Sequence, residues 1–426
     1  NNPDPSKGKQ EELKRICSEI LACFQKSQLQ HDSESKSDPT LNVNASTNID
    51  LGADRQLKQL EAQGSYIAGR ALDISSMDSH NKKAEKLLSK AAKLDPLNID
   101  AWNALGICIW KRQDVVAARD CFLGSLEQRK NKVALRYLSM VLRKSGTTKE
   151  EKVKNLEESL TRAKDAVALD LKDSESWYIL GNTYLSRFFA ISHNMADLES
   201  SLKAYQMSER TAVGRKSSAD MYFNRAQIYC YLEKYVEAIG DLEISLALDP
   251  TLPSKDKIDE IKTKLKRFSS LIATKGKIKS KKLQKIVHGL NSVEQRPTND
   301  TDASKTPQKE QEIDSIQYLS QGENKGKFLY VKSLIPLSKE PPVSFLAIDK
   351  SMNVFALSVY HLNDTILDKV RHERDVLKIS DPVLNLIEWD SQKFPLIQIK
   401  KPHKFLLNGE ISKFLAHAAT FSEIKY

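Results

Sequence analysis

Four polar side chains in this sequence are suited to holding a peptide. Arg143 follows Leu142 on a segment with helical spacing, and a guanidinium can bind a carboxylate through two parallel hydrogen bonds. Asp220 stands just before another helical segment, where it could receive a guanidinium. Asn182 and Asn224 carry amides that can both donate to and accept from an extended backbone. These residues predict a peptide-binding surface, and two surface amides on helices are the alternative interpretation of the asparagines.

A lysine-rich strip, KGKIKSKKLQK at 275–285, is suited to nucleic-acid phosphates because it has six lysines and no acid. Between residues 255 and 285 twelve Lys or Arg stand against three acids, which accounts for nearly the whole net charge of +10. Lysine contacts phosphate as a point charge, and the strip has no aromatic residue that could stack on bases. The predicted contacts are Lys275, Lys277, Lys279, Lys281 and Lys282. A nuclear import signal and a solvated run of charge are the alternatives.

Motifs of catalysis and of metal binding are missing from the sequence. It has no phosphate-binding glycine loop, dinucleotide fingerprint, zinc-protease helix motif, nucleophile elbow or kinase catalytic loop. The eight His residues form no pair at metal spacing. The five cysteines lack C-x-x-C spacing and are expected to be small buried hydrophobes. We therefore predict a protein that is not an enzyme, without catalytic residues, cofactor or metal.

Composition places the chain among soluble globular proteins. It has 426 residues, of which 40% are hydrophobic and 29% charged, so two domains and linkers are expected. No stretch reaches the 18 or so consecutive apolar residues that a membrane span needs, and the first residues lack the core of a secretory signal. We expect no membrane partner, and a location in the cytoplasm and nucleus.

Internal repeats are the strongest signal for the fold. The best copy places Trp102, Leu105 and Gly106 on a first helix and Ala118 and Phe122 on a second, which is the tetratricopeptide repeat (TPR) pattern of about 34 residues. Gly and Ala are small because the two helices touch there, while the aromatic residues fill the space toward the next repeat. Other copies, near residues 66, 135, 177 and 222, bring the number of helix pairs to five, more than the roughly three that a stable stack needs.

Two further features follow from the repeat pattern. The spacing between copies is uneven, which predicts loops near 145–155 and 188–199. Asn182 and Asn224 occupy positions at which carboxylate-clamp TPR domains hold a peptide main chain, but Tyr178 replaces the first lysine of that clamp. A chaperone C-terminal tail is therefore a poor fit.

The chain changes character after Phe328, where short apolar or alternating runs separated by turn residues predict five or six strands. A small Greek-key barrel of oligonucleotide-binding (OB) type fits them, and a small sandwich is the alternative. The predicted fold is mainly α, a TPR superhelix followed by this small all-β domain. Its parts are an N-terminal amphipathic helix at 1–29, a disordered linker at 30–54, the TPR superhelix with its capping helix at 55–274, the basic segment at 275–290, a disordered linker at 291–324 and the OB-fold-like domain at 325–420.

Several segments resemble one family of TPR proteins, known both as the stress-responsive activator (Strap) of an acetyltransferase coactivator and as the tubulin autoregulation factor. They are KAEKLLSKAAKLDP at 83–96, AWNALG at 101–106, NKVALRYLSMVLRK at 131–144, SWYILGNTYLS at 176–186 and KGKIKSKKLQ at 275–284. The β region is similar to the family's C-terminal OB fold, so the resemblance spans roughly residues 55–420.

The resemblance implies an adaptor that binds the Met-Arg-Glu start of nascent tubulin at the ribosome and recruits machinery that degrades tubulin mRNA. The family's groove arginine falls on Arg143 and its groove aspartate on Asp220, so these would pair with the peptide Glu and Arg respectively. Its lysines that contact ribosomal RNA fall on Lys279 and Lys281. The implied partners are the tubulin peptide, the ribosome and a downstream mRNA-decay adaptor.

The family's second groove acid lies shortly after the last Asp-Pro, where this chain has Ser254, with Asp256 as the nearest acid that could substitute. The family is also linked to nuclear stress-response transcription. The alternative function is therefore a nuclear scaffold that binds an acetyltransferase coactivator through its TPRs and DNA or protein through its OB domain.

Overall fold

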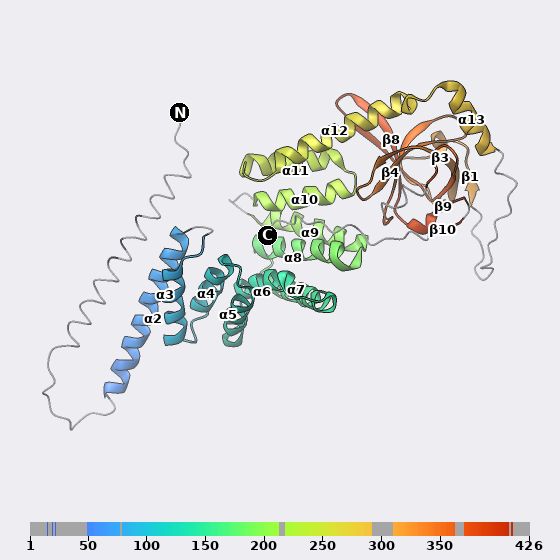
Figure 1. Ribbon diagram of the computed structural model, residues 1–426. Coiled ribbons are helices and arrows are strands. Elements are labelled where there is room, and N and C mark those ends of the chain that lie inside the picture. Colours follow the sequence, from blue (N-terminus) through green and yellow to red (C-terminus); the bar gives the residue numbers. More distant parts are fainter. Residues whose placement is uncertain are drawn as a thin grey trace, which may run out of the picture. The chain divides into compact units, whose positions relative to one another are not determined.

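Twelve α-helices precede the β domain in the part of the chain that the computed structural model describes, which is residues 15, 19, 22, 49–76, 79–212, 218–291, 310–362, 370–408 and 410–411 (Figure 1). The helices are α2 (Ile49–Ser75), α3 (Lys82–Leu94), α4 (Ile99–Lys111), α5 (Val115–Gln128), α6 (Lys132–Lys144), α7 (Lys149–Leu169), α8 (Ser174–Arg187), α9 (Met195–Thr211), α10 (Ala219–Tyr231), α11 (Tyr235–Leu248), α12 (Ser254–Ala273) and α13 (Ser280–Asn291). A π-helical turn, η1 (Phe188–Ser192), follows α8, and a 3-10 turn, η2 (Lys275–Lys277), follows α12.

Polar side chains cap the starts of five successive helices, α3 to α7. In each, an oxygen of the residue before the helix accepts a hydrogen bond from a backbone N–H of the first turn, which has no partner inside the helix. These capping residues are Asn81, Asn98, Asp114, Asn131 and Thr148. At α7 the Glu151 side chain also accepts from the backbone N–H of Thr148, which completes a capping box. The helix starts are therefore encoded locally.

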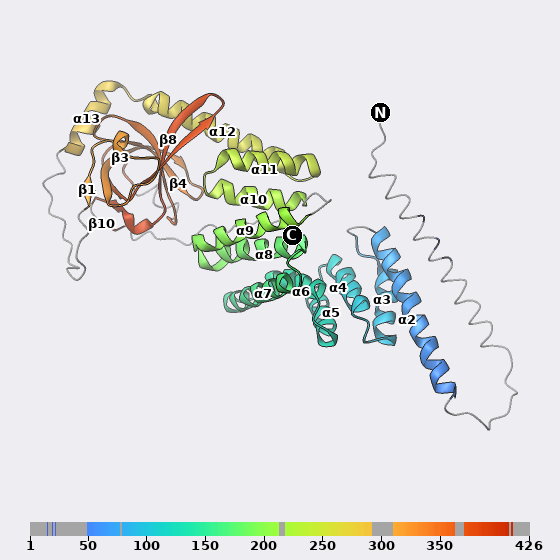
Figure 2. The ribbon, with the colours of Figure 1, turned by 180° about the vertical axis from the view of Figure 1, so that it is seen from behind.

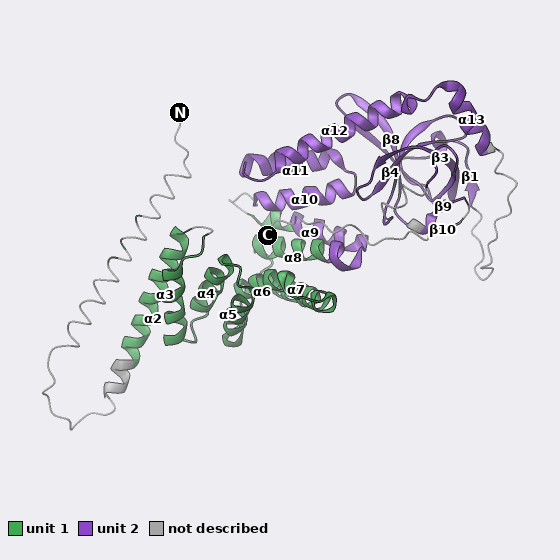
Figure 3. Ribbon diagram, viewed as in Figure 1, with its two compact units in different colours: residues 1–186, 206–214 green, residues 187–205, 215–426 purple. Residues whose placement is uncertain are grey.

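The chain forms two compact units, and their boundary does not follow the predicted one (Figure 3). One unit contains residues 1–186 and 206–214, and the other contains residues 187–205 and 215–426. The second unit thus joins helices α10 to α13 to the whole β domain, although the sequence predicted a separate TPR superhelix at 55–274.

Helices α2 to α7 of the first unit pack against one another in chain order, as the repeat pattern predicts. A Cβ atom at Gly106 would lie 2.7 Å from the ring of Phe122, and one at Gly69 would lie 2.8 Å from Leu88. Phe122 and Leu88 are fully buried. The prediction that small residues mark the contact between paired helices is therefore confirmed at these positions.

The two loops predicted from the uneven repeat spacing are largely wrong. Only residues 145–148 lie between α6 and α7, and the extra residues lengthen α7, whose Leu156, Leu160 and Ala163 are buried at helical spacing. At 188–199 the extra residues form η1 and the start of α9. There the Arg187 Nε donates to Asp197 Oδ2 at 3.0 Å, which ties the two helical segments together.

The β domain is one sheet of ten strands in the described residues. They are β1 (Gln311–Glu312), β2 (Gly322–Glu323), β3 (Lys327–Ser338), β4 (Val343–Ile348), β5 (Val354–Val359), β6 (Val376–Ser380), β7 (Val383–Trp389), β8 (Gln392–Ile399), β9 (Phe405–Leu407) and β10 (Glu410–Ile411). Their order is β10-β9-β6-β3-β4-β5-β8-β7-β2, with β1 paired to β3. The pairs are antiparallel except β5 with β8 and β1 with β3. This continuous path differs from the two separate sheets of a sandwich.

Helices α12 and α13 pack on the β domain inside the second unit, as opposite views show (Figure 2). The predicted apolar face of α12 is confirmed, because Ile258, Ile261, Leu265 and Phe268 are buried. These side chains share a core with Leu283 of α13 and with residues of β3, β4, β5 and β8. Helix α12 therefore ends the repeats by covering the sheet, where the sequence predicted a cap backed by solvent.

Three predicted boundaries need correction. Residues 310–324, predicted as linker, belong to the β domain, because Ile313, Ile316 and Leu319 are buried in its core. Helix α2 begins at Ile49 inside the predicted linker 30–54, and most of the basic segment 275–290 is helical. The predicted helix at 1–29 lies outside the described residues apart from Arg15, Glu19 and Ala22, and so do residues 30–48, 292–309 and 412–420.

Candidate peptide-binding residues and basic strip

Arg143 lies in the last turn of α6, beside a second positive charge. Its guanidinium nitrogens are shielded from solvent. The Lys144 ammonium lies 5.0 Å from the centre of the Trp110 ring, and burial together with the charge of Arg143 lowers the pKa of Lys144. Two positively charged side chains therefore lie close together at the end of α6.

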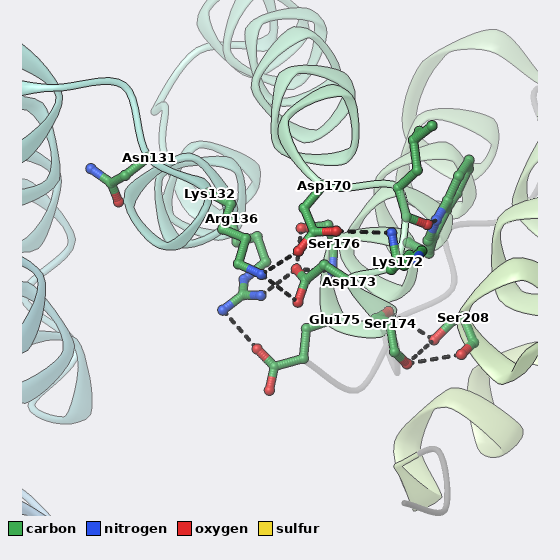
Figure 4. A network of polar contacts seen from close by, with 12 residues as sticks. Asn131, Lys132, Arg136, Asp170, Lys172, Asp173, Ser174, Glu175, Ser176 and Ser208 are labelled. Carbon is green, nitrogen blue, oxygen red and sulfur yellow. Dashed lines mark hydrogen bonds and ion pairs between the residues drawn. The ribbon is translucent and has the colours of Figure 1, made fainter. Parts of the chain in front are cut away.

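Arg136 lies two turns before Arg143 on α6, but its charge is used inside the fold (Figure 4). It contacts Asp173 at 2.5 Å and Glu175 at 2.7 Å, and Lys132 contacts Asp170 at 2.7 Å. Burial opposes ionisation of Asp173, but hydrogen bonds and charges from Ser176, Arg136 and Lys132 outweigh it and lower the pKa of that carboxyl. This network fixes the start of α8 against α6.

Asn182 and Asn224 are fully buried, on α8 and α10 respectively. The alternative that they are surface amides is therefore wrong. Next to Asn182, the Thr183 hydroxyl lies 3.2 Å from that of Ser139, so the contact between α6 and α8 is itself polar. A peptide main chain would reach either amide only after the side chains that cover it had moved, and their predicted role stays a prediction.

Asp220 lies in the first turn of α10 and is half-buried. A carboxylate at a helix N-terminus interacts favourably with the helix dipole. The next charged pair on this helix is already satisfied, because Arg225 Nε and Nη2 each donate to Asp241 at 2.7 Å and both side chains are buried. Arg143 and Asn182 belong to the first compact unit, and Asp220 and Asn224 to the second.

The structure distinguishes Ser254 from Asp256, the two residues that could replace the family's second groove acid. Ser254 is fully buried, and its hydroxyl donates to Ser245 Oγ at 3.0 Å. Asp256 lies exposed in the first turn of α12. Of the two, only Asp256 presents a group to a ligand.

The five predicted phosphate-binding lysines are all exposed, on η2 and the start of α13: Lys275, Lys277, Lys279, Lys281 and Lys282. Lys282 contacts Glu373 of the β domain at 2.6 Å, and the other four have no ion pair with any described residue. Gly276 makes the turn between α12 and α13 at a φ of 67°, where a Cβ atom would lie 3.1 Å from Leu346. The turn therefore holds the lysines beside the sheet, facing solvent.

Glu233 is a buried carboxylate with several hydrogen-bond donors, and the sequence analysis did not single it out. It lies in the α10–α11 turn with a φ of 58° and is 2% exposed. Its carboxylate accepts from Ser358 Oγ at 2.6 Å, from Gln398 Nε2 at 2.9 Å and from Tyr360 OH at 3.3 Å. Burial raises the pKa of Glu233, although the hydrogen bonds from these donors act to lower it. Tyr235 OH also donates to it at 3.5 Å, but no local signal could have found the site, because the three nearer donors lie more than a hundred residues away in the β domain.

The described residues contain no group of three His, Cys, Asp or Glu that could hold a metal ion, and no helix long and apolar enough to cross a membrane. Cys108 and Cys121 are buried free thiols, and burial raises their pKa values to about 11 and about 12. The prediction of small buried hydrophobes is confirmed for these two, Cys230 is only half-buried, and Cys17 and Cys23 lie outside the described residues.

Comparison with known proteins decides the family. The chain is 37% identical over 362 residues to human tetratricopeptide repeat protein 5, covering 83% of this chain and 81% of that protein. It belongs to the tetratricopeptide repeat protein 5 family. The mouse protein is 36% identical over 310 residues, covering 71% of this chain and 70% of its own length. The resemblance stated from the sequence is thereby confirmed.

The β domain has its own match. Residues 310–419 match the model of the tetratricopeptide repeat protein 5 OB fold domain, so the OB-fold prediction is confirmed. This match begins where the structure places the domain, at residue 310. The TPR part is similar to the crystal structure of YrrB, described as a TPR protein with an unusual peptide-binding site, with 19% identity, a TM-score of 0.34 and coverage of 49% of this chain and 97% of that one.

Proposed function

We propose that this member of the tetratricopeptide repeat protein 5 family is a non-enzymatic adaptor for the N-terminal Met-Arg-Glu peptide of nascent tubulin. It would hold that peptide at the ribosome and promote tubulin mRNA decay through a downstream adaptor. The observation that carries the proposal is the presence of Arg143 and Asp220 at the two positions that the family resemblance assigns to the peptide Glu and Arg.

The surroundings of both residues support these roles. The Arg143 guanidinium is shielded from water, and an ion pair is stronger where solvent screening is reduced. Asp220 lies in the first turn of α10, where a carboxylate interacts favourably with the helix dipole. Arg136 and Arg225 are already bound to acids of the protein, so they do not compete for the peptide's glutamate.

The test is direct binding of a fluorescent peptide that begins Met-Arg-Glu-Ile. Arg143→Ala and Asp220→Ala should each weaken binding by about thirtyfold or more, since breaking a desolvated ion pair costs roughly 2 to 5 kcal/mol. Arg119→Ala and Asp120→Ala are matched controls, because they remove an exposed pair of the same two residue types on α5. Equal affinities for all four variants and the native chain would refute the assignment.

The exposed lysines support the ribosomal half of the proposal. Lys279 and Lys281 face solvent without an ion pair among the described residues, which leaves both charges for RNA phosphate. Lys282 shares its charge with Glu373, so we rank it below them. The contact would be independent of RNA sequence, since no aromatic residue stands within the strip.

The same exposed strip favours one second candidate, a nuclear scaffold for an acetyltransferase coactivator in which the lysines act in import. The OB domain would then bind DNA or protein. Imaging the native chain and a Lys279→Glu, Lys281→Glu variant under stress separates the two. Loss of nuclear entry in the variant favours the scaffold, and unchanged distribution with lost ribosome binding favours the adaptor.

A further inference from the structure

Strand β7 has an edge that is covered only at its beginning. It pairs with β8 along its whole length, from Val383 to Trp389. On its other side β2 covers only Val383 and Leu384. From Asn385 onward no described strand pairs with this edge. An open strand edge is a template on which another extended chain can add.

The backbone groups that face this edge can be assigned from the pairing. The Asn324 N–H donates to the Pro382 carbonyl at 3.1 Å, so residue 382 faces β2. Residues that face one side alternate along an antiparallel strand, and the β7–β8 register is unbroken. Leu386 and Glu388 therefore direct their N–H and C=O groups to the open edge.

A cavity of about 430 Å³ lies along this edge. Its helical wall includes Met195, Leu198 and Leu202, which are spaced three and four residues apart and so share one face of α9. Its sheet wall includes Leu386 and Ile387, both only half-buried. The space thus combines backbone hydrogen-bonding groups on one side with apolar surface for a side chain on the other.

The charge of the lining indicates a basic occupant. Four glutamates and two lysines line the cavity. Glu199 and Glu237 are exposed and have no ion pair with any described residue, whereas Glu388 pairs with Lys393. A cationic side chain would gain most at the two unpaired acids.

We propose that this cleft binds an extended peptide of a partner protein, which adds to the free edge of β7 as a further strand. The peptide would carry an apolar residue and a Lys or Arg two positions apart, so that both side chains project from the same face of the strand into the cavity, the basic one toward Glu199 and Glu237. A single strand fits better than the sheet of a second copy, because residues of α9 and of the α10–α11 turn wall the same space. The site is separate from Arg143, Asp220 and the lysine strip.

The experiment is selection of a phage-displayed library of random 12-residue peptides on the full chain. It is repeated on a Glu199→Lys, Glu237→Lys variant and on the control Glu243→Lys, an exposed glutamate of α11 outside the cavity. We expect sequences with apolar and basic residues two positions apart from the native and control chains only. An enriched peptide should bind the double variant about tenfold or more weakly and Glu243→Lys unchanged.

A second arm tests the strand geometry. The enriched peptide is made in two forms, each N-methylated at alternate residues, so that one form loses the N–H groups of one edge and the other form those of the opposite edge. One form should bind about tenfold or more weakly and the other almost normally, since two or more hydrogen bonds are lost on one side only. The proposal would be overturned if the double variant enriched the same peptides as the native chain, or if the two methylation patterns weakened binding equally. It would also be overturned if light scattering showed a dimer of the native chain that the double variant abolishes.

Discussion

Replacing Glu233 by alanine is expected to loosen the packing of the α10–α11 turn on the β domain. Two of the donors to this carboxylate have other partners: Ser358 also bonds Ser344 Oγ at 3.0 Å, and Gln398 also donates to the Leu232 carbonyl at 3.2 Å. The hydroxyl protons of Tyr360 and Tyr235 both lose this acceptor.

The loss of stability in Glu233→Ala can be estimated from the hydrogen bonds that are lost and those that remain. Each stranded buried donor costs about 1 to 3 kcal/mol and the vacated space adds to this, while removing a buried carboxylate returns part of its burial cost. We therefore expect Glu233→Ala to lower local stability by about 2 to 4 kcal/mol. Glu237→Ala, an exposed glutamate four residues later, should change it by less than about 0.5 kcal/mol.

The assay is hydrogen exchange of the full chain, because a chain with two compact units need not unfold in one step. Amides of the α10–α11 turn and of β8 should exchange faster in Glu233→Ala and normally in Glu237→Ala. Unchanged protection of both segments would refute the view that this carboxylate links them.

The pH dependence of stability is a second test of the Glu233 site. Burial raises the pKa of Glu233 above its ordinary value of 4.5, so the folded state holds the proton more tightly than the unfolded state does. The folding free energy that this shift contributes is fully present below the ordinary pKa and is lost as the pH rises through the pKa of Glu233 in the folded state. Glu233→Gln imitates the protonated form and lacks this loss, so its stability relative to the native chain should increase as the pH rises from 4.5. A constant difference would contradict the buried, shifted carboxylate.

Two other predictions concern the lysine strip and the repeat packing. Ribosome co-sedimentation should fall as salt is raised, and Lys279→Glu with Lys281→Glu should abolish it, because each phosphate contact releases counterions; sedimentation unaffected by the charge reversal would exclude this contact. Gly106→Ala should destabilise the first unit by about 1 to 3 kcal/mol in chemical denaturation, since its Cβ would lie 2.7 Å from Phe122. Gly240→Ala, with nothing within 4 Å of the added Cβ, should instead stabilise α11 by up to about 1 kcal/mol, and similar effects of the two would refute the packing argument.

The repeat pattern was readable because its physics is local. Gly106 and Phe122 belong to one helix pair and lie sixteen positions apart, so their complementary sizes appear directly in the sequence. The caps at Asn98 and Asn131 also act within their own first turns. Strand alternation after Phe328 is local for the same reason. Each of these features depends on neighbours that the chain places within a few turns.

Only part of the candidate peptide-binding site could be predicted from the sequence. The residue types of Arg143 and Asp220 indicate which charges a peptide would need, but burial of the Asn182 and Asn224 amides depends on helices that pack around them. The sequence also offered Ser254 and Asp256 as equals. Only packing showed that one hydroxyl is turned inward to Ser245.

The sequence by itself determined the TPR helix pairs, the strand-rich region after Phe328 and the concentration of positive charge at 275–285, while it left an OB barrel and a small sandwich open and gave the family as a resemblance. Tertiary structure alone decided where the chain divides into compact units, that residues 310–324 belong to the β domain, and that Glu233 is buried against Ser358, Tyr360 and Gln398. The physical reason is the range of the interactions. Helix periodicity, caps and strand alternation are set by neighbours in the chain, whereas burial and strand edges are set by segments that meet only after folding.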